Sequence, residues 1–448
     1  MPENHDLTVA SIPRLIKSIS IPVMIGFFFN TMFNVVDTYF GGKISTEALA
    51  ALSLSFPVFF LIIIFDSGLS TGATAVIANA LGAKDEEQAR MLVAQSISLG
   101  IIISIILTIL GPISAPYLFV WLGASGSYLD LAVEYIDIIF FASIFFILES
   151  NFGAALQARG NTSVTRNFLI GGFFLNVLFD PWFLYGGFGV PAFGFKGVAI
   201  ATSLIQALGA LYLFIKAKEY GLVSQGTWKE MKPNWHYYKE ILKQAGPASV
   251  NMVTIGAGIF VITYFINQFG QDAVAAYGIA TRVEQIVLLP TIGLTIAALS
   301  IIGQNNGAGK FDRVKDALKK CLEYGVYIML AGGAFIFASS GIIMKFFTSD
   351  ANVVSIGAHY LKIAAGITVA YALLFISVSA LQGMKKPMYA VWIGIYRQLL
   401  APIIIFTLLI QYFHVGIDGI WWGIFFITWS AAIVTVVYTK HVLKNYSN

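Results

Sequence analysis

The sequence predicts an all-α integral membrane protein with twelve transmembrane helices, arranged as two six-helix lobes related by a pseudo-twofold axis. Three observations lead to this prediction: the composition of the chain, the spacing of its apolar segments, and a similarity between its two halves. Of the 448 residues, 58% are hydrophobic and only 11% are charged, whereas an average soluble domain carries about 25% charged residues. A chain this apolar is expected to cross a bilayer many times.

Twelve segments are long and apolar enough to cross a bilayer as helices, which takes about 20 mostly apolar residues each. The polar stretch before the first of them does not resemble a cleaved signal peptide, so we expect that first segment to be retained as a helix. No run of short alternating strands suggests a β-barrel. The twelve predicted spans are 16–41, 49–80, 93–119, 128–157, 167–188, 197–217, 246–269, 274–304, 318–344, 354–383, 388–413 and 417–440.

The basic residues fall almost entirely on one side of this topology. With twelve spans, the loops on the side that holds both termini carry 21 Lys and Arg residues, and the other side carries only Lys43, Lys196 and Lys345. Positive charge is retained on the cytoplasmic side of membranes. We therefore expect both termini to be cytoplasmic, and a miscounted span would have destroyed this sorting.

The two halves of the chain resemble each other at a constant offset. Gly82-Ala83 is matched by Gly307-Ala308, and Leu156-Gln157 is matched by Leu381-Gln382 at the same distance along the chain. Such repetition indicates a duplicated six-helix unit. Six is an even number, so both copies insert in the same direction, with the symmetry axis along the membrane normal.

The longest polar segment separates these two copies. It predicts an N-terminal lobe over residues 1–217, a cytoplasmic linker over 218–245 and a C-terminal lobe over 246–448.

Four oxygen-bearing residues are predicted to lie at one depth in the N-terminal lobe. Asp37 lies near the outer end of the first span, and Asn176 and Asp180 lie four residues apart on one face of the fifth. Thr202 follows about one turn inside the start of the sixth span. Carboxylates are costly within a membrane and usually functional. This set suits a hard monovalent cation such as Na+, or a proton shared between two carboxylates. The alternative is that both acids are merely solvated at the outer interface.

Other polar residues within the spans predict further roles. Pro22 lies midway along the first span, where a proline favours a kink; this is either a static kink or a hinge that moves Asp37. We consider Asn34, Asn151, Arg282 and Glu284 as candidate residues of a substrate cavity. For Arg397, within the eleventh span, two alternatives stay open. Its side chain is either paired inside the protein or extends to the membrane interface.

Several classes of protein do not fit the chain. It has no G-x-x-x-x-G-K-[ST] phosphate loop, and its five histidines are scattered and form no H-E-x-x-H pattern. A single cysteine, Cys321, leaves no internal disulfide. We therefore expect neither an enzyme nor an ATP-driven pump, and a carrier is favoured over a channel because no filter-like loop is present.

Five sequence stretches together resemble the multidrug and toxic compound extrusion (MATE) family, in its DinF-like prokaryotic branch. They are "NVVDTYFGG", "ANALGAKDEEQAR", "AALQARGNT", the "N-x-x-x-D-P" of the fifth span and "GVAIAT" of the sixth. The resemblance covers nearly the whole chain. In that family the N-lobe cation site matches Asp37, Asn176, Asp180 and Thr202, and a further polar residue of the cavity matches Asn151. The acids that some relatives carry in spans seven and ten are missing here.

The resemblance implies a secondary active antiporter in the inner membrane of a prokaryote. It would export cationic, lipophilic or aromatic compounds in exchange for H+ or Na+ by a rocker-switch cycle, as a monomer without cofactors or nucleic-acid partners. The alternative is a flippase for a lipid-linked saccharide from the same superfamily.

Overall fold

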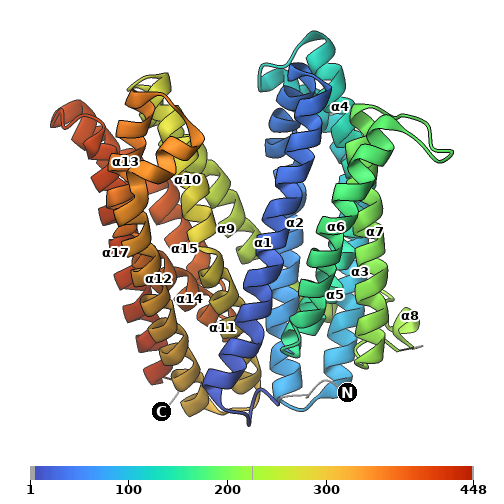
Figure 1. The fold of residues 1–448 in the computed structure, drawn as a ribbon. Coiled ribbons are helices and arrows are strands. Elements are labelled where there is room, and N and C mark those ends of the chain that lie inside the picture. Colours follow the sequence, from blue (N-terminus) through green and yellow to red (C-terminus); the bar gives the residue numbers. More distant parts are fainter. Residues whose placement is uncertain (1–5, 225, 446–448) are drawn as a thin grey trace. The chain divides into compact units, whose positions relative to one another are not determined.

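The computed structural model describes residues 6–224 and 226–445 and is helical almost throughout (Figure 1). Nine of its described helices are long and apolar enough to cross a membrane, and there are twelve spans if each of three bent helix pairs counts as one. Each predicted apolar segment overlaps one of these twelve spans. The predicted fold class is thereby confirmed.

The elements follow one another in an order that is similar in the two halves. The first half contains α1 (Ile12–Ile44), α2 (Thr46–Gly82), α3 (Glu86–Trp121), α4 (Gly126–Phe141), α5 (Ser143–Ala158), α6 (Ser163–Tyr185) and α7 (Phe195–Glu219). The short α8 (Thr227–Glu230) lies between the halves. The second half contains α9 (Trp235–Asn267), α10 (Gln271–Val287), α11 (Leu289–Gly307), α12 (Phe311–Phe347), α13 (Ala351–Ala365), α14 (Thr368–Gly383), α15 (Met388–Ile395), the π-helical turn η1 (Tyr396–Leu400), α16 (Ala401–Thr407), a second π-helical turn η2 (Leu408–Tyr412) and α17 (Asp418–Asn445).

The backbone repeats at the same offset as the sequence. The turn after α2 has a positive φ of 60° at Lys84, and the turn after α11 has a φ of 67° at Gly309. Gly160 after α5 and Lys385 after α14 form a second such pair, with φ values of 80° and 58°. Both pairs have the spacing that separates Gly82 from Gly307, so helix ends with left-handed residues recur at equivalent places in the two copies. This supports the predicted duplication.

Three predicted spans are broken, and their breaks have different origins. The bends are 46° between α4 and α5, 47° between α10 and α11, and 52° between α13 and α14. Pro290, near the start of α11, is suited to a new helix start, and Gly366 lies between α13 and α14. The break at Ala142 has neither residue type. There, Thr108 Oγ1 of α3 donates a hydrogen bond of 3.1 Å to the carbonyl of Phe140, so a neighbouring helix satisfies a carbonyl beside the break.

The helices pack as two units, each with its own hydrophobic core. One unit comprises Ile25–Ser249, and the other comprises Val250–Asn448 together with the described part of Met1–Met24. In the first unit α2, α3, α5, α6 and α7 are neighbours, and in the second α11, α12, α13, α14 and α17 are neighbours. The packing units divide at residues 24 and 249, and this division does not test the predicted lobe boundaries at 217 and 245. Those boundaries stay a prediction.

The first half of α1 packs with helices of the second repeat. Leu15, Ile16 and Ile19 are buried in the same core as residues of α11, α12 and α14. Ahead of the helix, Arg313 of α12 donates hydrogen bonds to the carbonyls of Leu7 at 3.2 Å and Ala10 at 2.7 Å. Helix α1 therefore begins in one unit and ends in the other.

The first turns of α9 repeat this arrangement with the opposite unit. Residues 235–245 fall in the predicted linker but are helical, because Tyr238, Ile241 and Ala245 recur at helical spacing and are buried in the core of the first unit. Gln95 of α3 also donates a hydrogen bond of 2.8 Å to the carbonyl of Lys232. Helix α9 crosses between the units at residue 249, and α1 crosses at residue 24, which is the equivalent position in the first copy of the repeat.

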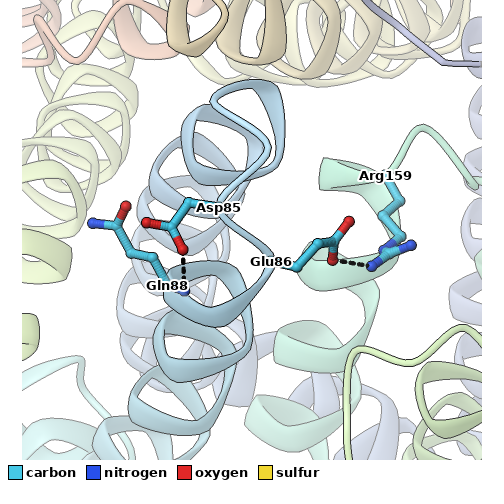
Figure 2. A network of polar contacts seen from close by, with 4 residues as sticks. All are labelled: Asp85, Glu86, Gln88 and Arg159. Carbon is cyan, nitrogen blue, oxygen red and sulfur yellow. Dashed lines mark hydrogen bonds and ion pairs between the residues drawn. The ribbon is translucent and has the colours of Figure 1, made fainter.

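Polar contacts tie together two loops of the first unit (Figure 2). Asp85 caps α3 by accepting a hydrogen bond of 2.8 Å from the backbone N–H of Gln88. The next residue, Glu86, pairs with Arg159 at the end of α5 at 2.7 Å. The start of α3 is thus fixed to the end of α5.

Candidate cation site

Asp37, Asn176 and Asp180 come into direct contact within the Ile25–Ser249 unit. Asn176 Nδ2 of α6 donates one hydrogen bond to Asp37 Oδ1 of α1 at 2.8 Å and another to Asp180 Oδ1 at 3.0 Å. Asn176 and Asp180 are fully buried, and Asp37 is 7% exposed. One amide therefore bridges two buried carboxylates from different helices.

Thr202 and Tyr135 complete the surroundings of these carboxylates. Thr202 of α7 is buried and within interaction range of Asp37. Tyr135 of α4 lies within electrostatic reach of both Asp37 and Asp180, and its ring stacks on Phe195 with centroids 5.3 Å apart. Tyr135 was not among the residues predicted for the site. Its position near the outer start of the fourth span, at the depth of the acids, was the signal that could have identified it.

The site contains more oxygen acceptors than donors. Asn176 Oδ1, Asp180 Oδ2 and Thr202 Oγ1 are buried and have no hydrogen-bond partner among the described residues. Buried polar atoms normally have partners, and two adjacent carboxylates repel each other when both are ionised. These oxygens would accept a proton or a small hard cation, which prefers oxygen ligands.

The side chains that could act as ligands carry at most two negative charges. Nowhere in residues 6–224 and 226–445 are three or more His, Cys, Asp or Glu side chains grouped to hold a metal ion. The cluster offers two carboxylates, one amide and one hydroxyl. Such a set fits Na+ better than a divalent or transition metal, which is usually held by more charged or nitrogen and sulfur ligands.

A close approach of α6 and α7 positions Asp180 and Thr202. Asn176 and Asp180 share one face of α6 because they are four residues apart. At the start of α7, a Cβ on Gly197 would lie 2.5 Å from the carbonyl oxygen of Phe183 in α6. Only glycine allows the two backbones to come this close.

Gly197→Ala should therefore destabilise the protein and separate the two sides of the site. The new methyl group meets backbone atoms that cannot rotate away, so α7 has to move. We expect the free energy of unfolding to fall by about 1–3 kcal/mol and the affinity of the cluster for Na+ to fall with it. Thermal unfolding of the purified protein, with and without the ion, measures both effects.

Gly171→Ala is the matched control for this substitution. Gly171 lies in α6, the helix that Gly197 of α7 approaches, but nothing lies within 4 Å of a Cβ placed there. That variant should be neutral or stabilising by up to about 1 kcal/mol, since alanine favours helix. Equal behaviour of the two variants would contradict the close-approach argument.

The candidate cavity residues do not join this cluster. Asn34 is exposed, and among the described residues its amide donates a hydrogen bond only to the carbonyl of Asn30 in its own helix. Asn151 is 1% exposed, and its Oδ1 has no partner among the described residues. In the other packing unit, Arg282 is exposed and Glu284 is 7% exposed. Their roles in substrate binding stay predictions.

A second pair of acids occurs in the same unit, between α2 and α5. Asp66 lies within electrostatic reach of Glu149 and interacts with Ser150. Asp66 Oδ1 is buried without a partner among the described residues. Among the described residues, hydrogen bonds from Asn176 join the two acids of the first cluster, and no hydrogen bond joins Asp66 to Glu149.

Known proteins resemble this chain in sequence and in fold. The profile of the MatE family matches residues 22–182 and 247–408. A probable multidrug resistance protein NorM of Thermotoga maritima is 28% identical over 423 residues, covering 93% of this chain and 89% of the relative. An FAD transporter of Shewanella oneidensis is 28% identical over 410 residues, covering 89% of this chain and 88% of that protein.

A solved structure has the same fold over the whole chain. It is a MATE protein in the bent conformation, which superposes with a TM-score of 0.93 at 25% identity. The match covers 100% of this chain and 99% of the solved one.

Proposed function

The chain belongs to the MatE family of multidrug efflux transporters, and on this premise we propose that it exports cationic, lipophilic compounds in exchange for H+ or Na+. The protein is a multi-pass membrane protein that acts on small molecules. The finer points of the proposal are the coupling ion, a monomeric state, the inner membrane of a prokaryote, and cytoplasmic termini. The proposed cycle moves compounds and ions across the membrane and includes no catalysed reaction.

The buried cluster of Asp37, Asn176 and Asp180 is the observation that carries this proposal. Its carboxylates are joined by one amide and retain unpartnered oxygens among the described residues. A coupling ion can drive transport only if it binds two states of the carrier with different affinity. In this proposal H+ or Na+ binds at the cluster in one state, and substrate binding in the other state follows its release.

Helix α1 links the cluster to the conformational change. It carries Asp37 in one packing unit, and its first turns belong to the other unit. Pro22 lies two residues before the boundary at Met24, and in α9 Pro247 lies two residues before the boundary at Ser249. A proline inside a helix lacks one backbone hydrogen bond and lowers the cost of bending there. We therefore assign Pro22 as the hinge of a rocker-switch cycle.

Pro22→Ala should slow exchange without abolishing ion binding. Alanine restores the missing backbone N–H and stiffens α1, so the interconversion of states slows while the cluster keeps its ligands. Transport rate in vesicles and equilibrium ion binding on the purified protein separate the two effects. Pro57→Ala in α2, which lies wholly within one unit, is the control. Wild-type transport by the Pro22 variant would refute the hinge.

Dye efflux under defined gradients tests the proposed function. Vesicles containing the protein are loaded with the fluorescent cation ethidium and given only a sodium gradient or only a pH gradient. The proposal expects efflux under at least one gradient, and its loss when that gradient is collapsed. Efflux that is independent of both gradients, or a deletion that impairs envelope synthesis but not drug tolerance, would favour a channel or the flippase alternative.

A further inference from the structure

The Val250–Asn448 unit contains a buried acid that is separate from the cation site. Glu284 of α10 is 7% exposed, and Tyr360 of α13 donates a hydrogen bond of 3.0 Å to its Oε1. Among the described residues no ion pair is formed by Glu284. An ionised carboxylate buried with one neutral donor is costly.

Aromatic rings pack around Tyr360, the hydrogen-bond donor to this acid. Tyr360 and Trp421 have centroids 4.7 Å apart, and Tyr277, two turns before Glu284 on α10, lies 5.4 Å from Tyr360 and 5.9 Å from Trp421. Tyr360 and Trp421 are almost completely buried, and Trp421 Nε1 has no partner among the described residues. Rings at these distances are in contact. A drug-sized ligand would have to force them apart, whereas a proton needs no additional space.

One positive charge, Arg397, lies among the tyrosines that neighbour Glu284. Arg397, on the π-helical turn η1, lies over the rings of Tyr371 and Phe375, with 5.7 Å to each centroid. Tyr371 and Tyr277 are within electrostatic reach of both Arg397 and Glu284. Among the described residues no salt bridge joins Arg397 to Glu284, so no ion pair holds the carboxylate ionised. The titratable groups within electrostatic reach of the acid are Tyr277, Tyr360 and Tyr371. Of the other charged residues on the neighbouring helices, Arg282 on α10 and Lys362 on α13 are exposed.

A comparison of the two repeats shows that Glu284 does not correspond to either acid of the candidate cation site. Tyr360 is the counterpart of Tyr135 in the second copy, and each faces a buried carboxylate in its own unit. At the same offset, the positions of Asp37, Asn176 and Asp180 are occupied by Ile262, Ala401 and Ile405, which all belong to one hydrophobic cluster. The second copy thus has a tyrosine at the position of Tyr135, apolar residues at the positions of Asp37, Asn176 and Asp180, and a buried acid on another helix.

We propose that Glu284, held by Tyr360, is a second proton-binding group, loaded and emptied once in each transport cycle. This proposal rests on the proposed antiport. It adds one proton to each transport cycle, and that proton binds at Glu284 and not at Asp37. The carboxylate oxygen binds the proton and releases it to water, with no other bond formed or broken.

Infrared difference spectroscopy of the full-length protein tests this proposal without a substrate. The C=O stretch of protonated carboxyl groups is followed between acidic and alkaline pH. The wild type should contain a band that disappears on alkalisation, and Glu284→Gln should lack it. If Glu284→Gln shows the same pH-dependent bands as the wild type, the proposal is wrong. A Glu284 band that persists unchanged at every pH would also refute it, because the acid would then be permanently protonated.

Proton release on ethidium binding, measured with a pH indicator in weak buffer, gives a second readout. Glu284→Gln should release fewer protons than the wild type, by about one per chain, and Tyr360→Phe should reduce release at neutral pH because the ionised carboxylate loses its donor. The control is Glu323→Gln, which changes a partly exposed acid paired with Lys320 at 2.8 Å. If Asp37→Asn keeps full gradient-driven efflux, the central role of the Asp37 cluster fails, and efflux that is independent of both gradients would contradict the proposed antiport; the infrared result on Glu284 is independent of both outcomes.

Discussion

Asp37→Asn is expected to abolish gradient-driven efflux while leaving the protein folded. Asparagine keeps the size of the side chain and can still meet Asn176, but it removes one of the two negative charges that attract the coupling ion. Removing one charged partner from a buried site costs on the order of 2–5 kcal/mol, or about 30-fold or more in affinity. Ethidium efflux from vesicles and drug tolerance of a sensitive host measure the loss.

Thr38→Ala controls for changes to this part of α1. Thr38 is the next residue but is exposed, and its hydroxyl bonds only to the carbonyl of Asn34 in the same helix. It should transport as the wild type does. Full drug tolerance in the Asp37 variant, at equal expression, would remove the central role of the cluster.

Asn176→Leu should produce the largest loss of stability among the site variants. Leucine has a similar volume but no amide, so two buried carboxylates lose their shared donor. We expect the free energy of unfolding to fall by about 2–4 kcal/mol at neutral pH. The loss should shrink as the pH is lowered, because protonation of one carboxylate removes the repulsion and provides a new donor. Thermal unfolding across pH measures the effect.

A second substitution tests the cause of that loss. In Asn176→Leu with Asp180→Asn, only one carboxylate remains and an amide is restored nearby, so most of the stability should return. The double-mutant cycle separates this coupling from simple repacking. If Asn176→Leu loses stability equally at all pH values, or if the second change lowers stability further, the bridging role of the amide is wrong.

The contacts among Asp37, Asn176 and Asp180 illustrate how much of this arrangement the sequence could indicate, while their role in cation binding stays a prediction. Asn176 and Asp180 share a helix face because of their spacing alone, and Asp37 is anomalous because an acid in an apolar span is costly. The count of spans predicted that Thr202 lies at the same depth in the membrane as these residues. That the acids meet through one amide depends on the packing of α1 against α6. The predicted depth of Tyr135 in the membrane was a signal for its place in the site, but its proximity to the acids depends on the packing of α4.

The candidate cavity residues illustrate the limit more clearly. Asn34 and Asn151 looked equivalent, as amides within apolar spans, yet one is exposed and the other is buried. Glu284 and Arg282, two residues apart, differ in the same way. Helical periodicity shows that two such residues cannot share a face, but it does not show which face meets a neighbour.

The sequence by itself determined the twelve spans, their sorting by charge and the duplication, because hydropathy, loop charge and internal repetition are properties of the chain read in order. Only the tertiary structure decided where three of the spans break, that α9 begins as a helix within the predicted linker, and that α1 and α9 pass from one packing unit to the other. These features depend on partners far away in the chain, such as Thr108 for the carbonyl of Phe140 and the core of the first unit for Tyr238 and Ile241. Contacts of this kind arise from packing between helices, and no periodicity within a single helix encodes them.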